Sequence, residues 1–210
     1  MSGPTAAIEG KHGIWDQVTG RFEVPELGDC GRGFAIERTN LKFFPSEFHS
    51  QAPLALALQL REKVAAVDID AVRVQTYYTC YSEIGSEAEK WNPRTRETAD
   101  HSLPYLLALA LIDGDVGSDS FSEARMRDPA LGALMQRISI AENAAFTREY
   151  PAKLMTQIEI VTKSGERFVE TASYAKGHAR NPMSDAEIDI KFTRMTEKLM
   201  SAERRTALLQ

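Results

Sequence analysis

Apolar side chains recur at helical spacing in two parts of the chain. A stripe at positions 56, 60, 64 and 67 predicts a helix over residues 50–67 that is buried on one side, with Ser50 as its N-cap and Pro53 in its first turn. A second stripe follows the capping box Ser184-Asp185-Ala186-Glu187 and predicts a closing helix. Its apolar members are Ile188, Phe192, Met195 and Leu199.

Residues 103–112 are apolar on every face of a helix. They stop at Asp113-Gly114, where Gly114 suits a left-handed C-terminal cap. A helix that is apolar all round has to be buried within an assembly of helices. Residues 14–18, 120–123 and 129–138 predict shorter helices.

Alternating apolar and polar positions predict four strands, over residues 34–44, 70–78, 154–162 and 167–174. The turn Lys163-Ser164-Gly165-Glu166 predicts that the last two strands form a hairpin. The elements do not alternate between strand and helix often enough for a parallel doubly wound sheet. We therefore expect an α+β fold, a two-layer sandwich in which helices cover one face of a mainly antiparallel sheet.

We expect three parts along the chain. Residues 1–33 form a loop-rich lead-in, residues 34–180 form the α+β domain with a helical insertion near 97–138, and residues 181–210 form the closing helix. The longest apolar run, 103–112, is short of the ~20 residues that cross a bilayer, and no leader peptide is visible. We expect no membrane segment and no secretion signal.

Composition and charge narrow the classes of function. The 210 residues are 43% apolar and 26% charged, which is ordinary for a globular protein. The net charge of −5 argues against a nucleic-acid partner, because such partners require an excess of cations. Cys30 and Cys80 are expected as free thiols in a reducing, cytoplasmic setting. Two cysteines are too few for an iron–sulfur cluster, which takes about four cysteine ligands.

Several familiar catalytic motifs are missing from the sequence. Residues 28–33 are dense in glycine but fit neither dinucleotide-binding nor P-loop spacing, so a flexible approach to the first strand is the stronger interpretation. No Cys/His cluster has zinc-ligand spacing, and no Gly-x-Ser-x-Gly elbow is present. We expect no metal and no cofactor.

Two segments place polar side chains near predicted helix starts. Lys42, Glu47 and His49 lie at a strand-to-helix junction, where a turn can aim side chains into a cleft and the helix N-terminus favours anions. A surface lysine and a histidine near a cap explain the same residues without a site. His101 and Tyr105 open the most apolar helix, either as site residues or as a capped, hydrogen-bonded helix start.

A third segment is the basic loop before the closing helix. It contains His178 and Arg180, either as site residues or as parts of a solvated turn. A fourth segment, Gly-Pro-Thr-Ala-Ala-Ile-Glu-Gly at residues 3–10, indicates by itself only a loop followed by a brief helix.

Taken together and in this order, these segments resemble the C-terminal half of the MmgE/PrpD family. The resemblance rests on residues 3–10, on Asp-His-Ser-Leu-Pro-Tyr at 100–105 with Asp113-Gly114, and on Gly-His-Ala-Arg-Asn-Pro-Met at 177–183. Phe-Pro-Ser-Glu-Phe-His-Ser-Gln at 44–51 resembles the 2-methylcitrate dehydratase branch in particular. The resemblance covers essentially the whole chain.

The resemblance implies a lyase that eliminates water from a hydroxy tricarboxylate without a cofactor. It also implies an N-terminal helical half or subunit that contributes much of the active site, so we expect the isolated chain to be inactive. The apolar helix at 103–112 fits a chain that lacks this partner surface. Homodimerisation and a small di- or tricarboxylate substrate are further expectations. The alternatives are a non-catalytic assembly or binding domain, or part of an epimerase acting on an acidic dicarboxylate.

The resemblance also assigns residues. Lys42 corresponds to an active-site lysine and Tyr105 to an active-site tyrosine, whereas Glu47 occupies the position of a histidine in the decarboxylase branch. His49 corresponds to the histidine of the 2-methylcitrate branch, which leaves open whether Glu47 or His49 faces the substrate. We therefore expect Lys42, His49 and Tyr105 as catalytic residues. The expected substrate-binding residues are Lys42, Glu47, His101, His178 and Arg180.

Overall fold

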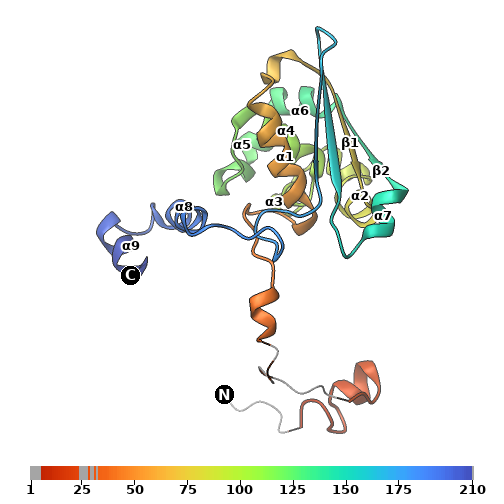
Figure 1. Ribbon diagram of the computed structural model, residues 1–210, viewed down its shortest axis with the longest axis vertical. Coiled ribbons are helices and arrows are strands. Elements are labelled where there is room, and N and C mark those ends of the chain that lie inside the picture. The colour runs from red at the N-terminus through yellow and green to blue at the C-terminus, as the bar shows by residue number, and fades with distance from the viewer. Residues whose placement is uncertain (1–5, 24–27, 29–30, 32, 210) are drawn as a thin grey trace. The chain divides into compact units, whose positions relative to one another are not determined.

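Four strands form one sheet in the computed structural model, which describes residues 6–23, 28, 31 and 33–209 (Figure 1). The strands are β1 (Ile69–Thr76), β2 (Ile138–Glu142), β3 (Thr156–Thr162) and β4 (Arg167–Ala172), in the spatial order β2-β1-β3-β4. β1 pairs with β3 and β3 with β4 in antiparallel fashion, and β1 pairs with β2 in parallel. The predicted hairpin and the mainly antiparallel sheet are confirmed.

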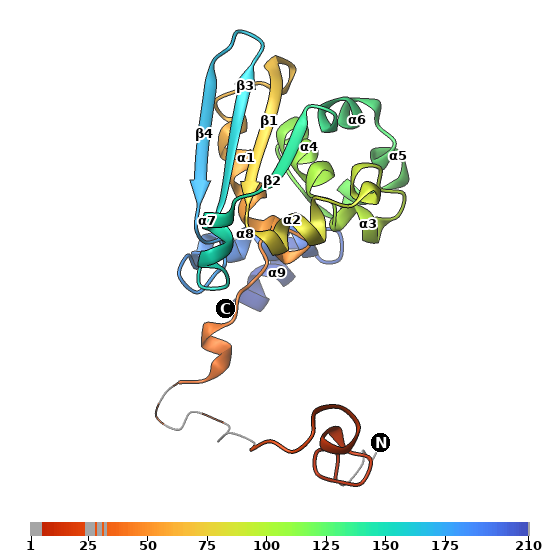
Figure 2. The same ribbon diagram turned by 90° about the vertical axis from the view of Figure 1, so that its right-hand side faces the viewer.

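One face of the sheet is apolar and covered by helices. Val72 and Val74 of β1 and Ile158 and Ile160 of β3 are buried on this face. Helices α1 (Gln51–Arg61) and α4 (Leu103–Asp113) lie behind it in Figure 2. Because the strands alternate in burial, their other side chains point to the opposite face. The α+β class is confirmed.

The opposite face of the sheet is polar. Glu159 of β3 is paired with Arg73 of β1 at 2.8 Å and with Arg167 of β4 at 3.2 Å. Cross-strand pairs of this kind stabilise a sheet modestly, and their charge leaves this face suited to water.

Helix α4 is buried by this chain alone. Every residue from Leu103 to Leu111 is buried, and α4 packs against α1 and α6 (Pro129–Met135). Gly114, with φ of 74°, ends the helix as predicted. The expectation that α4 needs a partner surface outside this chain is therefore wrong, since the described residues already enclose it.

The helix predicted over residues 50–67 is shorter in the structure. A 3-10 helix, Phe48–Ser50, leads into α1, which ends at Arg61. Val64 is still buried, but Val67 is 72% exposed within a second 3-10 turn, Ala66–Asp68, that leads into β1. The chain reverses direction here, so the last member of the apolar stripe no longer faces the core.

The strand predicted over residues 34–44 is wrong. Ala35–Arg38 form a 3-10 helix, and Phe34 and Ile36 are 53% and 74% exposed. Alternation stabilises a strand only where one face is buried and an edge is available for pairing. Within the described residues this segment pairs with no strand, so its alternation has no sheet to support it.

The second helix of the middle region also ends early. α6 stops at Met135, and Ile138, predicted as the end of this helix, instead opens β2. The other short elements here are α2 (Tyr78–Ile84), α3 (Arg96–Asp100), α5 (Glu123–Met126), α7 (Ala144–Glu149) and the 3-10 helices Ala88–Trp91 and Ser118–Phe121.

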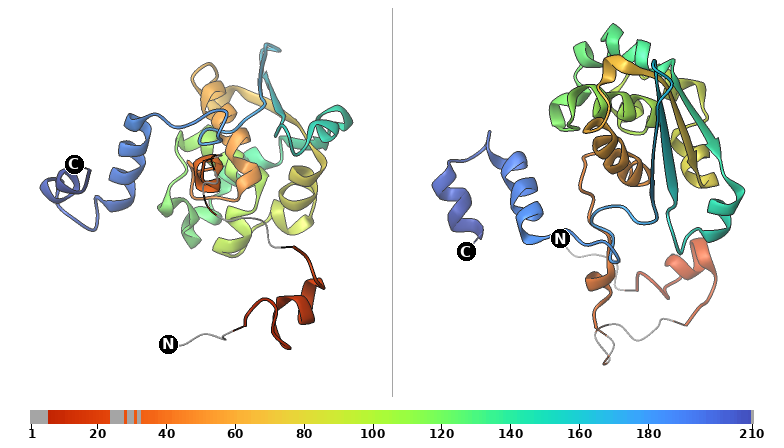
Figure 3. Two further views of the ribbon diagram at one scale, coloured as in Figure 1. Left: turned by 60° about the horizontal axis from the view of Figure 1, so that its bottom comes forward. Right: turned by 45° about the horizontal axis from the view of Figure 1, so that its top comes forward.

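The chain ends in two helices that lie side by side, α8 (Asp185–Thr196) and α9 (Ala202–Leu209) (Figure 3). The capping box of α8 is confirmed, because Ser184 Oγ accepts from the Glu187 N–H while Glu187 accepts from the Ser184 N–H at 2.8 Å. The apolar stripe of α8 is not enclosed, since Met195 is 64% exposed; Leu199, which the pattern placed in the same stripe, lies beyond the end of α8 and is 78% exposed.

The chain divides into two compact units, Met1–Thr39 and Asn40–Gln210. The first contains a π-helix, Trp15–Thr19, close to the predicted short helix, and the second contains the sheet and its helices. The boundaries expected at residues 33 and 180 stay predictions.

No helix in the described ranges is both long and apolar enough to cross a membrane. Cys80 is a free, buried thiol whose pKa is raised to about 12 by burial. Cys30 lies outside the described residues.

Candidate functional site

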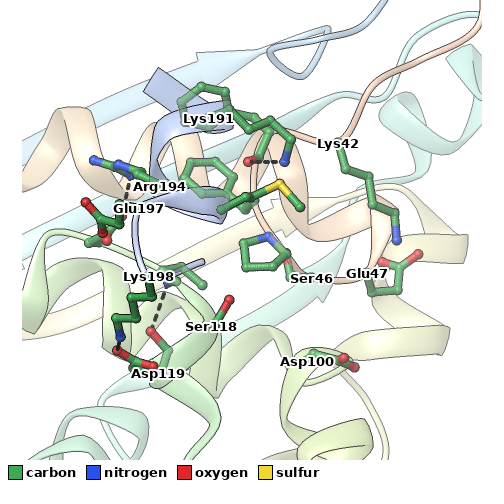
Figure 4. A pocket seen from close by; sticks show the side chains of 18 of the residues that line it. Lys42, Ser46, Glu47, Asp100, Ser118, Asp119, Lys191, Arg194, Glu197 and Lys198 are labelled. Atoms are coloured by element: carbon green, nitrogen blue, oxygen red, sulfur yellow. Dashed lines mark hydrogen bonds and ion pairs between the residues drawn. The ribbon is translucent and has the colours of Figure 1, made fainter. Parts of the chain in front are cut away.

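A pocket of about 930 Å³ lies between the segment that precedes α1 and one side of α8 (Figure 4). The wall on the α1 side consists of residues 42–47, the end of α3 at Asp100 and His101, and the loop 115–120. The facing wall consists of residues 191–199. The pocket therefore joins parts of the chain that are far apart in sequence.

Gln51, at the start of α1, fixes the shape of the first wall. Its side-chain oxygen accepts hydrogen bonds from the backbone N–H groups of Phe43 and Phe44, both at 2.9 Å. Its nitrogen donates to Phe44 O at 3.1 Å and to Ser46 Oγ at 3.0 Å. Because Gln51 is buried, these bonds hold the turn rigidly in place. The sequence pattern does not single out Gln51 as a site residue, although it belongs to the 44–51 motif.

Glu47 is fixed at the pocket by its backbone and its side chain. Its N–H donates to Asp100 O at 2.9 Å, which ties the segment to the end of α3. Its Oε2 accepts from the His49 N–H at 2.5 Å and so caps the 3-10 helix. The side chain is only 15% exposed, and it lines the pocket on the same side as Lys42 in Figure 4.

The cations of the pocket differ in how they are compensated. Arg194 pairs with Asp115 at 2.8 Å and Lys198 with Asp119 at 2.6 Å, so these two charges are neutralised within the pocket. Lys42, by contrast, is exposed and has no carboxylate partner in the part of the chain that the structure describes. It is therefore available to bind an anion.

Lys191 is a second cation without a carboxylate partner among the described residues. Its Nζ donates to Phe43 O at 3.2 Å, and burial lowers the pKa of this lysine. An incoming carboxylate would compensate the partly buried charge of Lys191 as well as the exposed charge of Lys42.

His49 lies behind Glu47 and is not part of the pocket lining. Its Nδ1 is 2.5 Å from Tyr77 Oη, and its Nε2 is 3.9 Å from Glu47 Oε1. Tyr77 stacks on Tyr150, with ring centroids 4.9 Å apart. The structure thus answers the geometric part of the open question: Glu47 faces the pocket. Tyr77, which directly follows β1, is not indicated by the sequence pattern, because it reaches His49 only in the folded chain.

Tyr105 is buried in the core and does not line the pocket. Its hydroxyl donates to Ser120 O at 2.6 Å, and burial raises its pKa to about 12. This bond holds the 115–120 loop of the pocket wall. His101, about half exposed, does line the pocket, and its Nδ1 contacts the Asp100 carboxylate and Glu97 O.

His178 and Arg180 lie outside the pocket lining. The His178 Nδ1 accepts from the Arg180 N–H at 2.9 Å, and the Arg180 side chain donates to Tyr174 Oη at 2.6 Å. Burial and the nearby Arg180 charge lower the pKa of His178. The structure therefore gathers Lys42, Glu47 and His101 at the pocket, while His49, Tyr105, His178 and Arg180 lie elsewhere.

The basic loop nevertheless positions one side of the pocket. Gly177 O accepts from the Leu41 N–H at 2.9 Å, directly before Lys42. Gly177 has φ of 86°, and a Cβ at this position would lie 2.0 Å from Leu41 O. Only glycine allows the loop to pack this closely against the residue before Lys42.

The described residues contain no group of three or more His, Cys, Asp or Glu side chains placed to hold a metal ion. What the pocket offers is a pair of uncompensated lysines beside a fixed carboxylate. Such a set can bind an anion and exchange a proton with it.

Residues 44–210 match the family model described as the MmgE/PrpD C-terminal domain. The chain is 32% identical over 180 residues to the 2-methylcitrate dehydratase of Escherichia coli K12, covering 78% of this chain and 37% of that protein. It is 32% identical over 195 residues to the enzyme of that name from Salmonella typhimurium, covering 86% and 39%. The chain thus spans less than two fifths of the length of these relatives.

Proposed function

The chain belongs to the MmgE/PrpD family, and from that premise we propose that it forms one wall of an active site that eliminates water from a hydroxy tricarboxylate such as 2-methylcitrate. The observation that carries the proposal is Lys42, a pocket cation with no carboxylate partner among the described residues, beside the fixed carboxylate of Glu47. The relatives named 2-methylcitrate dehydratase support the choice of substrate class.

Elimination of water removes a proton from a carbon next to a carboxylate and a hydroxyl from the neighbouring carbon. In our proposal Glu47 accepts the proton, and the electron pair of the broken C–H bond forms the new carbon–carbon double bond. The C–O bond breaks with its electron pair on oxygen, and an acid protonates that oxygen so that water leaves. Lys42 holds the substrate carboxylate and stabilises the negative charge that develops there.

The other expected site residues take supporting roles in this proposal. His49 faces the Glu47 carboxylate and does not touch the substrate. Tyr105 positions the loop of the pocket wall through its hydrogen bond to Ser120. His101 remains a substrate-binding candidate at the pocket edge. His178 and Arg180 act through the loop that packs against Leu41.

The acid and the remaining binding groups are proposed to come from the helical half that the family resemblance implies. The isolated chain is then expected to show no appreciable turnover, because catalytic groups that act as a unit fail together. We also propose self-association, since the exposed apolar residues of α8 and α9 favour a partner, and light scattering tests it.

The direct test is a chimera. In this chimera, residues 40–210 of this chain replace the corresponding part of the Escherichia coli relative. They include residues 44–210, which match the family model. Dehydration of 2-methylcitrate is then measured. Lys42→Met is compared with Lys63→Met, which removes a lysine paired with Glu170 away from the pocket. Loss of about 3 kcal/mol of transition-state stabilisation lowers kcat/KM roughly a hundredfold for Lys42→Met only.

Two results would contradict the proposal. A kcat/KM for Lys42→Met within about twofold of the parent chimera would show that Lys42 is not part of the site, because a twofold change corresponds to only ~0.4 kcal/mol. An active parent chimera that produces an epimer in place of an unsaturated acid assigns the pocket to epimerisation.

A further inference from the structure

Tyr77 carries a buried hydroxyl with a single acceptor. The residue is 1% exposed, and within the described residues its Oη has one hydrogen-bond partner, His49 Nδ1 at 2.5 Å. Burial raises the pKa of Tyr77 far above its usual range, and the nearby Cys80 and Glu47 add to the effect. Tyr77 therefore stays a neutral phenol with a proton to donate.

A buried O–H group without an acceptor costs free energy, so the Tyr77 proton points at His49 Nδ1. That nitrogen must then carry a lone pair, and the proton of the neutral imidazole is on Nε2. Nε2 is the nitrogen that lies 3.9 Å from Glu47 Oε1. The hydrogen-bond direction at Tyr77 thus decides whether the ring nitrogen that faces Glu47 carries a proton.

We propose that Tyr77 is a positioning residue that holds His49 in the Nε2–H tautomer, so that His49 presents an N–H to the Glu47 carboxylate. In the opposite tautomer a nitrogen lone pair would face the carboxylate, and the two would repel. The proposal rests on the proposed function, which places the substrate against Glu47.

The tautomer also settles which group can take the substrate proton. With Nδ1 bonded to Tyr77 and Nε2 protonated, neutral His49 has no free lone pair. Glu47 is then the proton acceptor, and the Nε2–H group of His49 faces its carboxylate. This assignment follows from the chain's own contacts and does not depend on which tricarboxylate binds.

Apart from Glu47, the described neighbours of the His49 ring are uncharged. Tyr77, between β1 and α2, and Tyr150, directly after α7, face the ring with centroids 5.5 Å and 6.2 Å away, and Phe48 lies at 5.8 Å. Cys80 of α2 donates its thiol to His49 O at 3.6 Å, and burial keeps that thiol protonated. Glu47 is the one carboxylate among the described residues that contacts the ring.

The test is the tautomer of His49 in the full 210-residue chain, with ¹⁵N-labelled histidine and long-range ¹H–¹⁵N spectra at a pH where the ring is neutral. His49→Gln identifies the signals. The expected result is that the wild type is Nε2–H. In Tyr77→Phe the tautomer ratio should change roughly fivefold toward Nδ1–H, the effect of losing a hydrogen bond of about 1 kcal/mol.

Tyr78→Phe is the matched control, because Tyr78 is the next residue and is 55% exposed, and it should leave the His49 spectrum unchanged. An Nδ1–H tautomer in the wild type overturns the proposal, and this measurement holds even if Tyr77→Phe does not fold. An unchanged ratio in folded Tyr77→Phe overturns it as well.

Failure of this inference is distinguishable from failure of the proposed function. A chimera that depends on Lys42 but contains Nδ1–H His49 contradicts only the role of Tyr77. If His49 is in the Nε2–H tautomer but the Lys42→Met chimera is fully active, only the proposed function is contradicted.

Discussion

Helices α4 and α8 differ in how their apolar side chains are buried. α4 is apolar on every face and is buried from Leu103 to Leu111 by the described residues, whereas α8 has an apolar stripe that stays partly exposed. α4 ends next to the loop that forms one wall of the pocket, and α8 forms the opposite wall. One wall is therefore held by a packed core, and the other by polar contacts.

This difference indicates which wall of the pocket contributes more to the free energy of unfolding. The first wall is fixed by Gln51 and by the core that α4 completes. The α8 wall is joined to it through Lys191 on Phe43 O and through the pairs of Arg194 and Lys198. Exposed ion pairs contribute little to stability, typically ~0–1 kcal/mol each. We infer that substitutions in the two walls differ strongly in effect.

The largest contrast is expected from two leucine-to-alanine substitutions, one in α4 and one just after α8. Leu107 of α4 is fully buried, so Leu107→Ala should lower the free energy of unfolding by about 2–5 kcal/mol. Leu199, just beyond α8, is 78% exposed, and Leu199→Ala should change it by less than about 0.5 kcal/mol. Urea unfolding measures both. Equal losses would show that Leu199 is buried against something.

The next contrast lies in two glycines with similar backbone conformations. Gly165 has φ of 88° with open space around its missing Cβ, and Gly165→Ala should cost about 1–2 kcal/mol from backbone strain alone. Gly177, with φ of 86°, would also clash with Leu41 O. Gly177→Ala should therefore cost about 1–3 kcal/mol more. Similar unfolding midpoints for the two variants would refute the close packing beside Lys42.

The smallest effect concerns the start of α8. The pKa of Glu187 is lowered from its ordinary 4.5, first by the Ser184 backbone N–H and then by Lys176 at 3.1 Å. A depressed pKa means that this stabilisation is present above pH 4.5 and is lost as the pH falls through the folded-state value.

Acidification below pH 4.5 should therefore loosen the first turn of α8 in the wild type, as amide hydrogen exchange reports. Glu187→Gln should remove this pH dependence, whereas Asp189→Asn on the same helix should retain it. A wild type whose α8 exchange is independent of pH in this range, after correction for the intrinsic rate, speaks against the capping box as the stabilising contact.

The sequence predicted the fold best where local pattern and burial coincide. β1 and β3 alternate because one face of the sheet is buried, and Ser184 to Glu187 form a local cap, so these elements could be predicted. Phe34 and Ile36 alternate as well, but no strand lies beside them in the described residues. β2 was missed because its short apolar pattern is explained only by its pairing with β1.

The site was predictable to a similar degree. Lys42, Glu47 and His101 line the pocket, and their motif neighbours indicated them. Tyr77 and the cations of α8 could not be predicted, because they meet the 42–49 segment only after the chain folds. The catalytic role expected of Tyr105 stays a prediction, and the structure shows its buried hydroxyl holding the 115–120 loop through Ser120 O.

The central claim is that Lys42 and Glu47 form a carboxylate-binding pocket with α8, and citrate titration of the ¹⁵N-labelled chain tests it most directly. Amides of residues 42–47, 115–120 and 191–199 should shift on binding. Lys42→Met should weaken binding about tenfold, while Lys63→Met should leave it unchanged. Shifts confined to other surfaces, or equal binding by both variants, would contradict the account.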